Sequence, residues 1–182
     1  MKKIIFGTTN ADKLTEASQI LNFDVKGVNL EIDEVQTLDK KEVAVKKAKA
    51  YYSQIKKPLF IEDVSLEIDY LKGLPGTYVD AFVKTLGPKG IADMIKGNNR
   101  SAKAITTLVY IWRKDKYKIF QGETIGSIAK KPKGEGFGWD PIFIPKGSMK
   151  TFGEMNIEEK NKYSMRKKAL FKMHKYLSGK NF

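Results

Sequence analysis

The spacing of apolar residues changes along this chain between a strand period and a helix period. The first half predicts mostly apolar strands that alternate with amphipathic helices. In order, these predicted elements are a strand over Lys3–Thr8, a helix over Ala11–Asn22, a strand near Asp24–Glu31, a helix over about Asp39–Gln54 and a strand over Pro58–Glu62. Strands and helices in this order are typical of an α/β fold.

The second half predicts two short helices, two long strands and a last helix. The Gly87-Pro88 pair separates the two short helices, because proline lacks a backbone donor and does not continue a helix easily. The two strands alternate apolar and polar residues and are expected to pair in antiparallel fashion. In order, these elements are Thr77–Leu86, Lys89–Lys96, Ser101–Trp112, Tyr117–Ile128 and Ser164–Leu177.

Length and composition restrict the chemistry. A length of 182 residues predicts a single domain over residues 1–182, able to bury roughly 70% of the surface that its unfolded chain exposes. The chain has no cysteine, and His174 is its one histidine. Thiol catalysis, Ser-His-Asp hydrolysis and histidine-based zinc sites are therefore not expected. Carboxylates, lysines and a bound ion must supply the chemistry, without a catalytic role for His174.

The formal net charge of +13 suggests an anionic partner, since the region from Ile144 onward holds ten Lys or Arg residues against three Glu. Nucleic acid and a polyphosphate substrate are the candidates, and a solvated lysine face is the simpler alternative. We expect no nucleic-acid partner, because no recognised nucleic-acid motif is present. The start at Met1–Ile5 has too short an apolar run for a signal peptide, and no stretch reaches membrane-spanning length. These features predict a cytoplasmic protein without a membrane partner.

The segment GEGFGWDPIF, from Gly134 to Phe143, gathers glycines and aromatics around one acid. Glycines allow tight turns and a close approach to a ligand, Phe137 and Trp139 offer flat apolar faces, and Asp140 adds a hydrogen-bond acceptor. A planar heterocycle such as a nucleobase fits these groups. A β-hairpin with aromatic cross-strand pairs is the structural alternative.

Four further segments accompany this one. They are IIFGTTNADKLTE from Ile4, DEVQ from Asp33, FIEDVSLEIDYLKGLPGTYV from Phe60 and TFGEMNIEEKNKYSMRKKAL from Thr151. Together the five segments resemble the inosine triphosphate pyrophosphatase family, over Lys3 to about Leu177. The resemblance implies an elongated α/β fold with a mixed twisted sheet, flanking helices, two lobes and a central substrate cleft, usually as a homodimer. It also implies hydrolysis of non-canonical purine nucleoside triphosphates (ITP, dITP, XTP) to monophosphate and pyrophosphate.

The first predicted strand ends at Thr8 and Thr9, where Asn10 opens a helix that carries Lys13. Backbone amides and the helix dipole at such a junction favour anions. An ordinary N-cap at Asn10 and an ordinary lysine in the first turn are the simpler explanation. The resemblance implies that TNADK is a phosphate-binding loop with Asn10 and Lys13 at its ligand positions, and Thr8 and Thr9 are expected to bind substrate as well. It also implies that Lys47, chosen from three nearby lysines by its spacing from the acidic pair, reaches the phosphates.

The acidic pair Glu62-Asp63 is predicted at the end of a buried strand, where alternation sends the two side chains in opposite directions. Such a pair is often only a turn or cap element. The resemblance implies that Asp63 is the general base or metal-orienting acid that prepares water for attack on the α-phosphorus. It implies that Glu34 of DEVQ binds metal, and the expected cofactor is Mg²⁺, which usually takes one or two carboxylates plus substrate phosphates.

The resemblance assigns the substrate base to two segments, and the residues expected to bind there are Phe137, Gly138, Trp139, Asp140, Lys160, Ser164 and Arg166. Phe137 is the expected stacking residue, and Arg166 the expected donor to an oxo group on the base. The chain departs from the family's usual Ser-His-Arg by carrying Met165, which either changes base preference or packs beside Ala169 and Met173. The alternatives are therefore a related pyrophosphatase with altered base preference, or a non-catalytic nucleotide-binding or RNA-binding protein.

Overall fold

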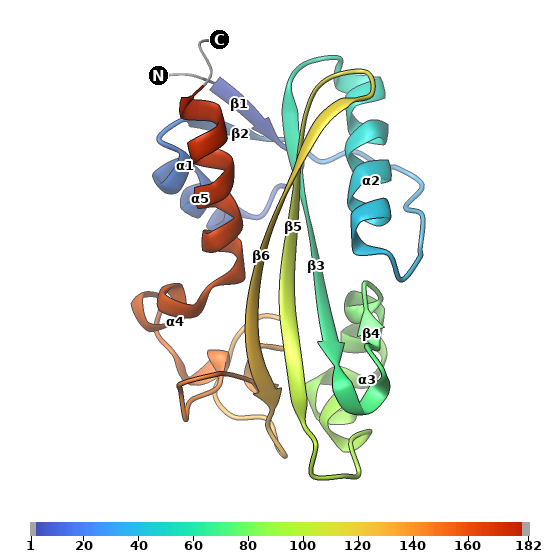
Figure 1. The fold of residues 1–182 in the computed structure, drawn as a ribbon, viewed down its shortest axis with the longest axis vertical. Coiled ribbons are helices and arrows are strands. Elements are labelled where there is room, and N and C mark those ends of the chain that lie inside the picture. Colours follow the sequence, from blue (N-terminus) through green and yellow to red (C-terminus); the bar gives the residue numbers. More distant parts are fainter. Residues whose placement is uncertain (1–2, 180–182) are drawn as a thin grey trace. The chain divides into compact units, whose positions relative to one another are not determined.

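The computed structural model describes residues 3–179 and has a mixed α/β fold, with helices flanking a mixed sheet (Figure 1). The strands are β1 Lys3–Phe6, β2 Asp24–Gly27, β3 Leu59–Ile68, β4 Pro75–Gly76, β5 Ser101–Arg113, β6 Lys116–Ile128 and β7 Phe143–Pro145. The α-helices are α1 Ala11–Leu21, α2 Lys40–Ile55, α3 Val79–Asp93, α4 Ile157–Tyr163 and α5 Met165–Ser178. The ends of the predicted domain, residues 1–2 and 180–182, lie outside the described residues.

The sheet has the strand order β2-β1-β3-β5-β6-β7, and β4 pairs with β3 off this path. Strand β1 runs parallel to both of its neighbours, β2 and β3, whereas β3–β4 and β6–β7 are antiparallel. The predicted mixed sheet is therefore confirmed. Among the helices of the described chain, none is long and apolar enough to cross a membrane.

The chain divides into two compact units at four points, which fall within β3, β5, β6 and α5. Unit 1 contains the described residues up to Asp63, Thr106–Gly122 and the described residues from Arg166 onward. Unit 2 contains Val64–Ile105 and Glu123–Met165. The single domain, its two lobes and its cleft stay predictions.

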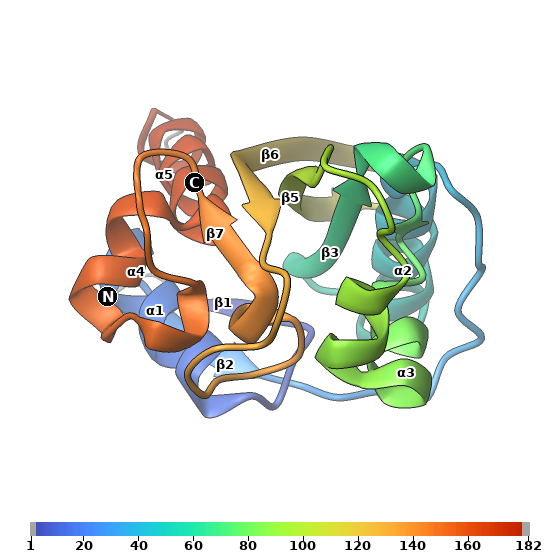
Figure 2. The same ribbon diagram turned by 90° about the horizontal axis from the view of Figure 1, so that it is seen from below.

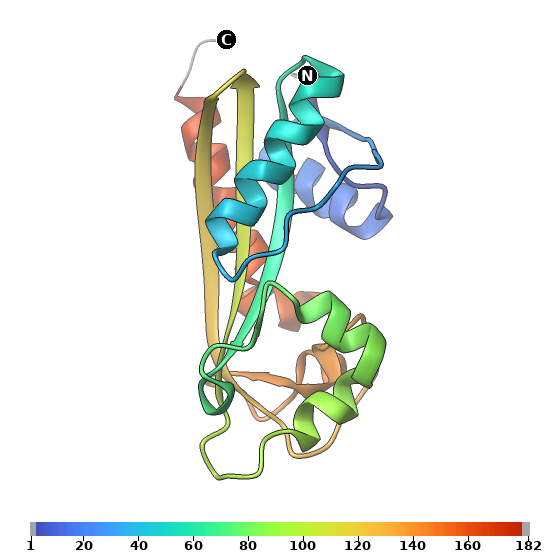
Figure 3. The same ribbon diagram turned by 90° about the vertical axis from the view of Figure 1, so that its right-hand side faces the viewer.

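In unit 1, different helices cover the two faces of the sheet because side chains alternate along each strand. On β3, Leu59 and Ile61 belong to a buried cluster with α2, while Phe60 belongs to a second cluster with α1 and α5. On β5, Val109 and Leu108 divide between the same two clusters. Figures 2 and 3 show α2 and α5 on opposite sides of these strands.

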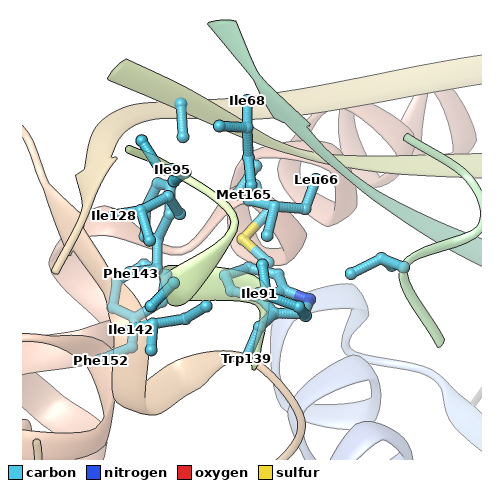
Figure 4. Packing of buried hydrophobic residues seen from close by; sticks show 14 residues of the cluster. Leu66, Ile68, Ile91, Ile95, Ile128, Trp139, Ile142, Phe143, Phe152 and Met165 are labelled. Carbon is cyan, nitrogen blue, oxygen red and sulfur yellow. The ribbon is translucent and has the colours of Figure 1, made fainter. Parts of the chain in front are cut away.

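Unit 2 has a cluster of its own, which gathers side chains from β3, α3, β5 and the segment around β7. Figure 4 shows Trp139 and Met165 pointing into this cluster beside Ile91. Helix α3 passes through the predicted break: Gly87 has φ 67° and ψ 172°, so two helical segments meet there. That conformation favours glycine, which has no Cβ to clash.

Several predicted boundaries are wrong. The second strand ends at Gly27 instead of Glu31, and residues 28–39 form neither helix nor strand. Strand β3 continues to Ile68 instead of ending at Glu62, because Leu66 and Ile68 keep the strand period and pack into the core of unit 2.

Other differences concern elements that the sequence pattern did not predict. The segment GEGFGWDPIF forms a loop, a 3₁₀ turn over Asp140–Ile142 and the start of β7, so the hairpin alternative is wrong. Helix α4 is a further short element, and it lacks a buried apolar face from which to predict it. The remaining predicted helices and strands are confirmed within a few residues.

Candidate active site

Unit 1 contains a pocket of about 420 Å³, formed by the loop after β1, the segment after β2, and side chains of α1, α2 and β3. Six of the residues predicted from the sequence line it, namely Thr8, Thr9, Asn10, Lys13, Glu34 and Lys47. The other lining residues are Phe6, Gly7, Asn29, Leu30, Glu31, Ile32, Tyr51 and Glu62. The sequence segments TNADK and DEVQ therefore meet at one pocket.

The start of α1 forms one wall of the pocket. Asn10 is the N-cap, and its Oδ1 accepts a hydrogen bond from the Lys13 backbone N at 3.0 Å. The Thr8 Oγ1 accepts a hydrogen bond from the Asn10 N at 3.2 Å. The expected N-cap is thus present, and it leaves a helix N-terminus, with its partial positive charge, at the edge of the pocket.

Glu62 is the buried acid of this pocket and is held by two cations. Its carboxylate lies 2.9 Å from Lys13 Nζ, and it accepts hydrogen bonds from Arg166 Nε at 2.7 Å and Nη2 at 3.1 Å. Burial alone would raise the pKa of Glu62, but Arg166 and Lys13 outweigh burial and lower it to about 2. Glu62 is therefore a fixed negative charge that orients Lys13.

Asp63 has the opposite behaviour because the strand turns its side chain toward other neighbours. Burial raises the pKa of Asp63 to about 6, with Glu34 and Glu62 adding to the shift and Lys47 opposing it. The Asp63 Oδ2 is buried and has no hydrogen-bond partner among the described atoms. Asp63 does not line the pocket directly, but it follows Glu62, which does. A carboxylate with an unsatisfied oxygen and a raised pKa is suited to accept a proton or to bind a cation.

Lys47 and Glu34 form an ion pair in the lining of the pocket, with Nζ 2.5 Å from Oε1. No group of three or more His, Cys, Asp or Glu side chains that could hold a metal ion occurs among residues 3–179. Mg²⁺ does not need such a group, because it usually takes one or two protein carboxylates and completes its shell with water and phosphate oxygens. Glu34 and the unsatisfied oxygen of Asp63 fit that requirement.

Six of the residues predicted to bind the base belong to unit 2. Asp140 is buried and lies 2.5 Å from Lys160 Nζ, which also sits 5.4 Å above the Phe152 ring. Trp139 is part of the core of unit 2 and is 8% exposed, whereas Phe137 is 81% exposed and offers an open aromatic face. The two other residues are Gly138, which has φ 66°, and the buried Ser164.

Arg166 and Met165 both have partners within the protein. Three N–H groups of Arg166 are used by Glu62 and by Glu16, whose Oε2 lies 3.1 Å from Nη1, so only its other donors are open to a base. Met165 is 8% exposed and packs in the core of unit 2. Met165 is therefore packed inside the protein, as the structural alternative expected, but in a different buried cluster from Ala169 and Met173.

Sequence reasoning missed several residues of the pocket. Strand alternation predicted only that Glu62 points away from Asp63, and the structure places Glu62 on the face of β3 that packs against α1 and α5. Tyr51 and Asn29 also line the pocket, and neither carries a local sequence signal that predicts this role. His174 is hydrogen-bonded to the Leu21 carbonyl and is not among the residues that line this pocket.

Comparisons with known proteins agree on one family. The model of the Ham1 family matches residues 4–176. A dITP/XTP pyrophosphatase of Methanopyrus kandleri is 40% identical over 173 residues, which cover 92% of each chain. An inosine triphosphate pyrophosphatase of Kluyveromyces lactis is 37% identical, over 96% of this chain and 95% of its own. The structure of a HAM1 protein from Coxiella burnetii superposes with a TM-score of 0.88 at 25% identity, covering 99% of this chain and 100% of that one.

Proposed function

Because this chain belongs to the Ham1 family, we propose that it hydrolyses non-canonical purine nucleoside triphosphates such as ITP, dITP and XTP to the monophosphate and pyrophosphate. The family resemblance identified from the sequence motifs is confirmed by the match over residues 4–176. The observation that carries the proposal is the pocket of unit 1, where two lysines and a helix N-terminus lie next to a carboxylate with a raised pKa. The first two groups suit phosphates, and the carboxylate suits a reaction with water.

The triphosphate binds in this pocket through charge-assisted hydrogen bonds. Lys13 and Lys47 donate to phosphate oxygens, and the amides at the start of α1 add further donors. Lys13 is oriented by Glu62, whereas Lys47 is paired with Glu34 in the free protein. Orientation of Lys13 by a fixed partner lowers the entropy cost of placing the phosphates for reaction.

Asp63 then orients a water molecule and accepts its proton as the water oxygen attacks the α-phosphorus. A new bond forms between the water oxygen and the α-phosphorus, and the bond from the α-phosphorus to the bridging oxygen breaks. Pyrophosphate leaves with the electron pair, and the lysines stabilise the negative charge that develops on it. The carboxylate form of Asp63 is the active one.

Mg²⁺ is the cofactor in this proposal, and Glu34 and Asp63 would hold it. When bound, the ion neutralises phosphate charge and polarises phosphoryl oxygens. The residues proposed to bind the substrate base are Phe137, Gly138, Trp139, Asp140, Lys160, Ser164 and Arg166. Homodimer formation and a cytoplasmic location remain predictions, and neither is required for this reaction.

The experiment that tests the function measures pyrophosphate release from ITP, dITP, XTP, ATP, GTP and CTP, with and without Mg²⁺. We expect the highest kcat/KM for the 6-oxo purines ITP, dITP and XTP, and little release without the ion. Highest activity on a canonical or pyrimidine triphosphate would favour altered base preference, which Met165 in place of the family's usual histidine gives reason to test. Binding without release from any triphosphate would contradict the proposal.

A further inference from the structure

We propose that Tyr51 is a positioning residue, which fixes the segment carrying Glu34 against α2 and thereby sets the geometry of the pocket. The inference rests on the proposed function for its catalytic consequence, and on contacts within unit 1 for its structural part. Residues 28–39 join β2 to α2 without regular structure, and Figure 3 shows this light blue segment running beside α2. Such a segment needs side-chain contacts to hold a catalytic group in place.

The Tyr51 hydroxyl makes the contacts that such a segment requires. Its oxygen accepts a hydrogen bond from the Leu30 backbone N at 3.3 Å, and it donates toward Asn29 Oδ1 at 3.5 Å. From residue 29 to residue 36, every hydrogen bond and ion pair that the structure describes ends on either Tyr51 or Lys47. The segment is therefore attached to α2 at two points.

The attachments by Lys47 and by Tyr51 behave differently when the substrate binds. Lys47 is bound to Glu34 here, and it must turn toward phosphate oxygens when the triphosphate binds. The Tyr51 hydroxyl is bound to the segment's backbone and carries no charge, so a triphosphate attracts it less strongly than it attracts Lys47. Once Lys47 turns to the substrate, Tyr51 is the remaining polar attachment that keeps Glu34 near Asp63.

The Tyr51 ring is itself rigidly held, which a positioning residue requires. Tyr51 is 3% exposed and packs in the α2 cluster of unit 1. A Cβ placed on Gly7 would lie 2.9 Å from the ring, so the backbone at the end of β1 lies directly against it. Tyr51 also follows Lys47 by one helical turn on α2, so both side chains lie on one face. One ring therefore contacts the loop after β1, α2 and the segment that holds Glu34.

The variant Tyr51→Phe removes the hydroxyl and keeps the ring. Tyr52→Phe is the matched control, since Tyr52 is the next residue, is half-buried in the same cluster, and has no side-chain hydrogen bond in the described structure. Hydrogen exchange of the free protein reports directly on the Leu30 amide. We expect Tyr51→Phe to accelerate this exchange about 5-fold, the factor that corresponds to one hydrogen bond, while Tyr52→Phe leaves it unchanged. Cleavage of the folded protein by a glutamate-specific protease after Glu31 or Glu34 should accelerate as well.

The catalytic consequence is measured on the same variants with ITP. Tyr51→Phe should raise the Mg²⁺ concentration that gives the half-maximal rate by about 3-fold to 10-fold. The midpoint of urea unfolding should be the same for Tyr51→Phe and Tyr52→Phe. Unchanged Leu30 exchange would overturn the attachment, and faster exchange with an unchanged Mg²⁺ requirement would overturn the positioning role. If the wild type released no pyrophosphate, the proposed function would fail while the exchange data still decided the attachment. Should Tyr51→Phe fail to fold, Asn29→Ala removes a partner of the same hydroxyl and should accelerate Leu30 exchange in the same direction.

Discussion

At the scale of single residues, Glu62 and Asp63 are two adjacent carboxyl groups whose pKa values differ widely. The pKa of Glu62 is about 2 and that of Asp63 is about 6, because one side chain meets Arg166 and Lys13 while the other is buried with an unsatisfied oxygen. Neighbouring acids with separated pKa values commonly take separate roles in a site. Here Glu62 holds a cation in place, and Asp63 is left to react.

We expect Asp63→Asn to lower kcat by about 100-fold or more, because the amide neither accepts the proton from water nor binds a cation as a carboxylate does. Affinity for the triphosphate should change little. Pyrophosphate release and equilibrium binding of ITP measure the two effects, with Asp80→Asn, a surface acid of α3, as the control. Turnover near the wild-type rate would remove Asp63 from the mechanism.

The raised pKa of Asp63 also predicts the pH dependence of the reaction. Since the carboxylate is the active form, kcat/KM should rise with pH below about 6 and level off above it. The effect on stability has the opposite sign. The pKa of Asp63 is raised from 3.8 to about 6 in the folded protein, so ionisation of Asp63 opposes folding. The contribution of Asp63 to the free energy of unfolding therefore falls as pH rises from about 4 to about 6. A pH–rate profile with ITP checks the first statement. An acid limb near pH 4 would contradict it.

Lys47 and Lys46 are adjacent on α2 but should differ in function. Lys47 lines the pocket, whereas Lys46 forms an exposed pair with Glu42. Loss of a charge-assisted contact costs ~1.5 to 3 kcal/mol, so Lys47→Ala should weaken triphosphate binding by roughly 10-fold to 150-fold. Lys13→Ala should act similarly, Lys46→Ala should have little effect, and nucleoside binding should be nearly unchanged in all three. Calorimetry with triphosphate and nucleoside measures this, and equal effects at positions 46 and 47 would refute the assignment.

At the scale of elements, the strand and helix periods predicted most of the sequence of strands and helices. The apolar residues that carry these periods are buried in β1, α1, α2, β5, β6 and α5. The length of β3 could not be read as easily, because its polar residues Glu62 and Asp63 resemble a strand end. Only tertiary contacts with Arg166 and Lys13 make a buried Glu62 acceptable there. Long-range partners of this kind leave no trace in local sequence.

Helix α5 shows how one element serves two cores. Its first residue, Met165, packs in unit 2 beside Trp139, whereas Ala169 and Met173 pack in unit 1. We expect Met165→His to lower the free energy of unfolding by ~1 to 3 kcal/mol, because a buried imidazole needs hydrogen-bond partners that the apolar cluster lacks.

The matched variant Met165→Leu keeps the side chain apolar and should lose less than about 1.5 kcal/mol. Urea denaturation of both variants gives the comparison. A histidine variant as stable as the leucine variant would mean that a polar partner is within reach of position 165. Trp139 is predicted to bind the substrate base and lies in the same cluster as Met165. A variant at position 165 that changes base preference should therefore also change stability.

At the scale of the whole molecule, the fold and the family could be predicted from sequence because five separated motifs agree in order and spacing. The site was predictable only in part. The family resemblance indicated Thr8, Thr9, Asn10, Lys13, Glu34 and Lys47, and these line one pocket. Tyr51 and Asn29 could not be inferred, since their role depends on where an irregular segment packs.

The excess of positive charge predicts general attraction of anions, yet we expect no specific nucleic-acid binding. RNA or duplex DNA, supplied at the same phosphate concentration as ITP, should inhibit pyrophosphate release only weakly, and inhibition should vanish as salt rises. Steady-state rates with ITP at two salt concentrations measure this. Tight competitive inhibition would favour the RNA-binding alternative.

The pocket itself does not share the charge of the molecule around it. Its lining contains two lysines, Lys13 and Lys47, against three glutamates, Glu31, Glu34 and Glu62. A bare polyanion is therefore drawn to the surface of the protein but meets a net negative lining at the point of entry. A triphosphate that carries its own divalent cation has less negative charge and is repelled less by the three glutamates. We therefore expect the metal complex of a triphosphate to bind more tightly than the free polyphosphate.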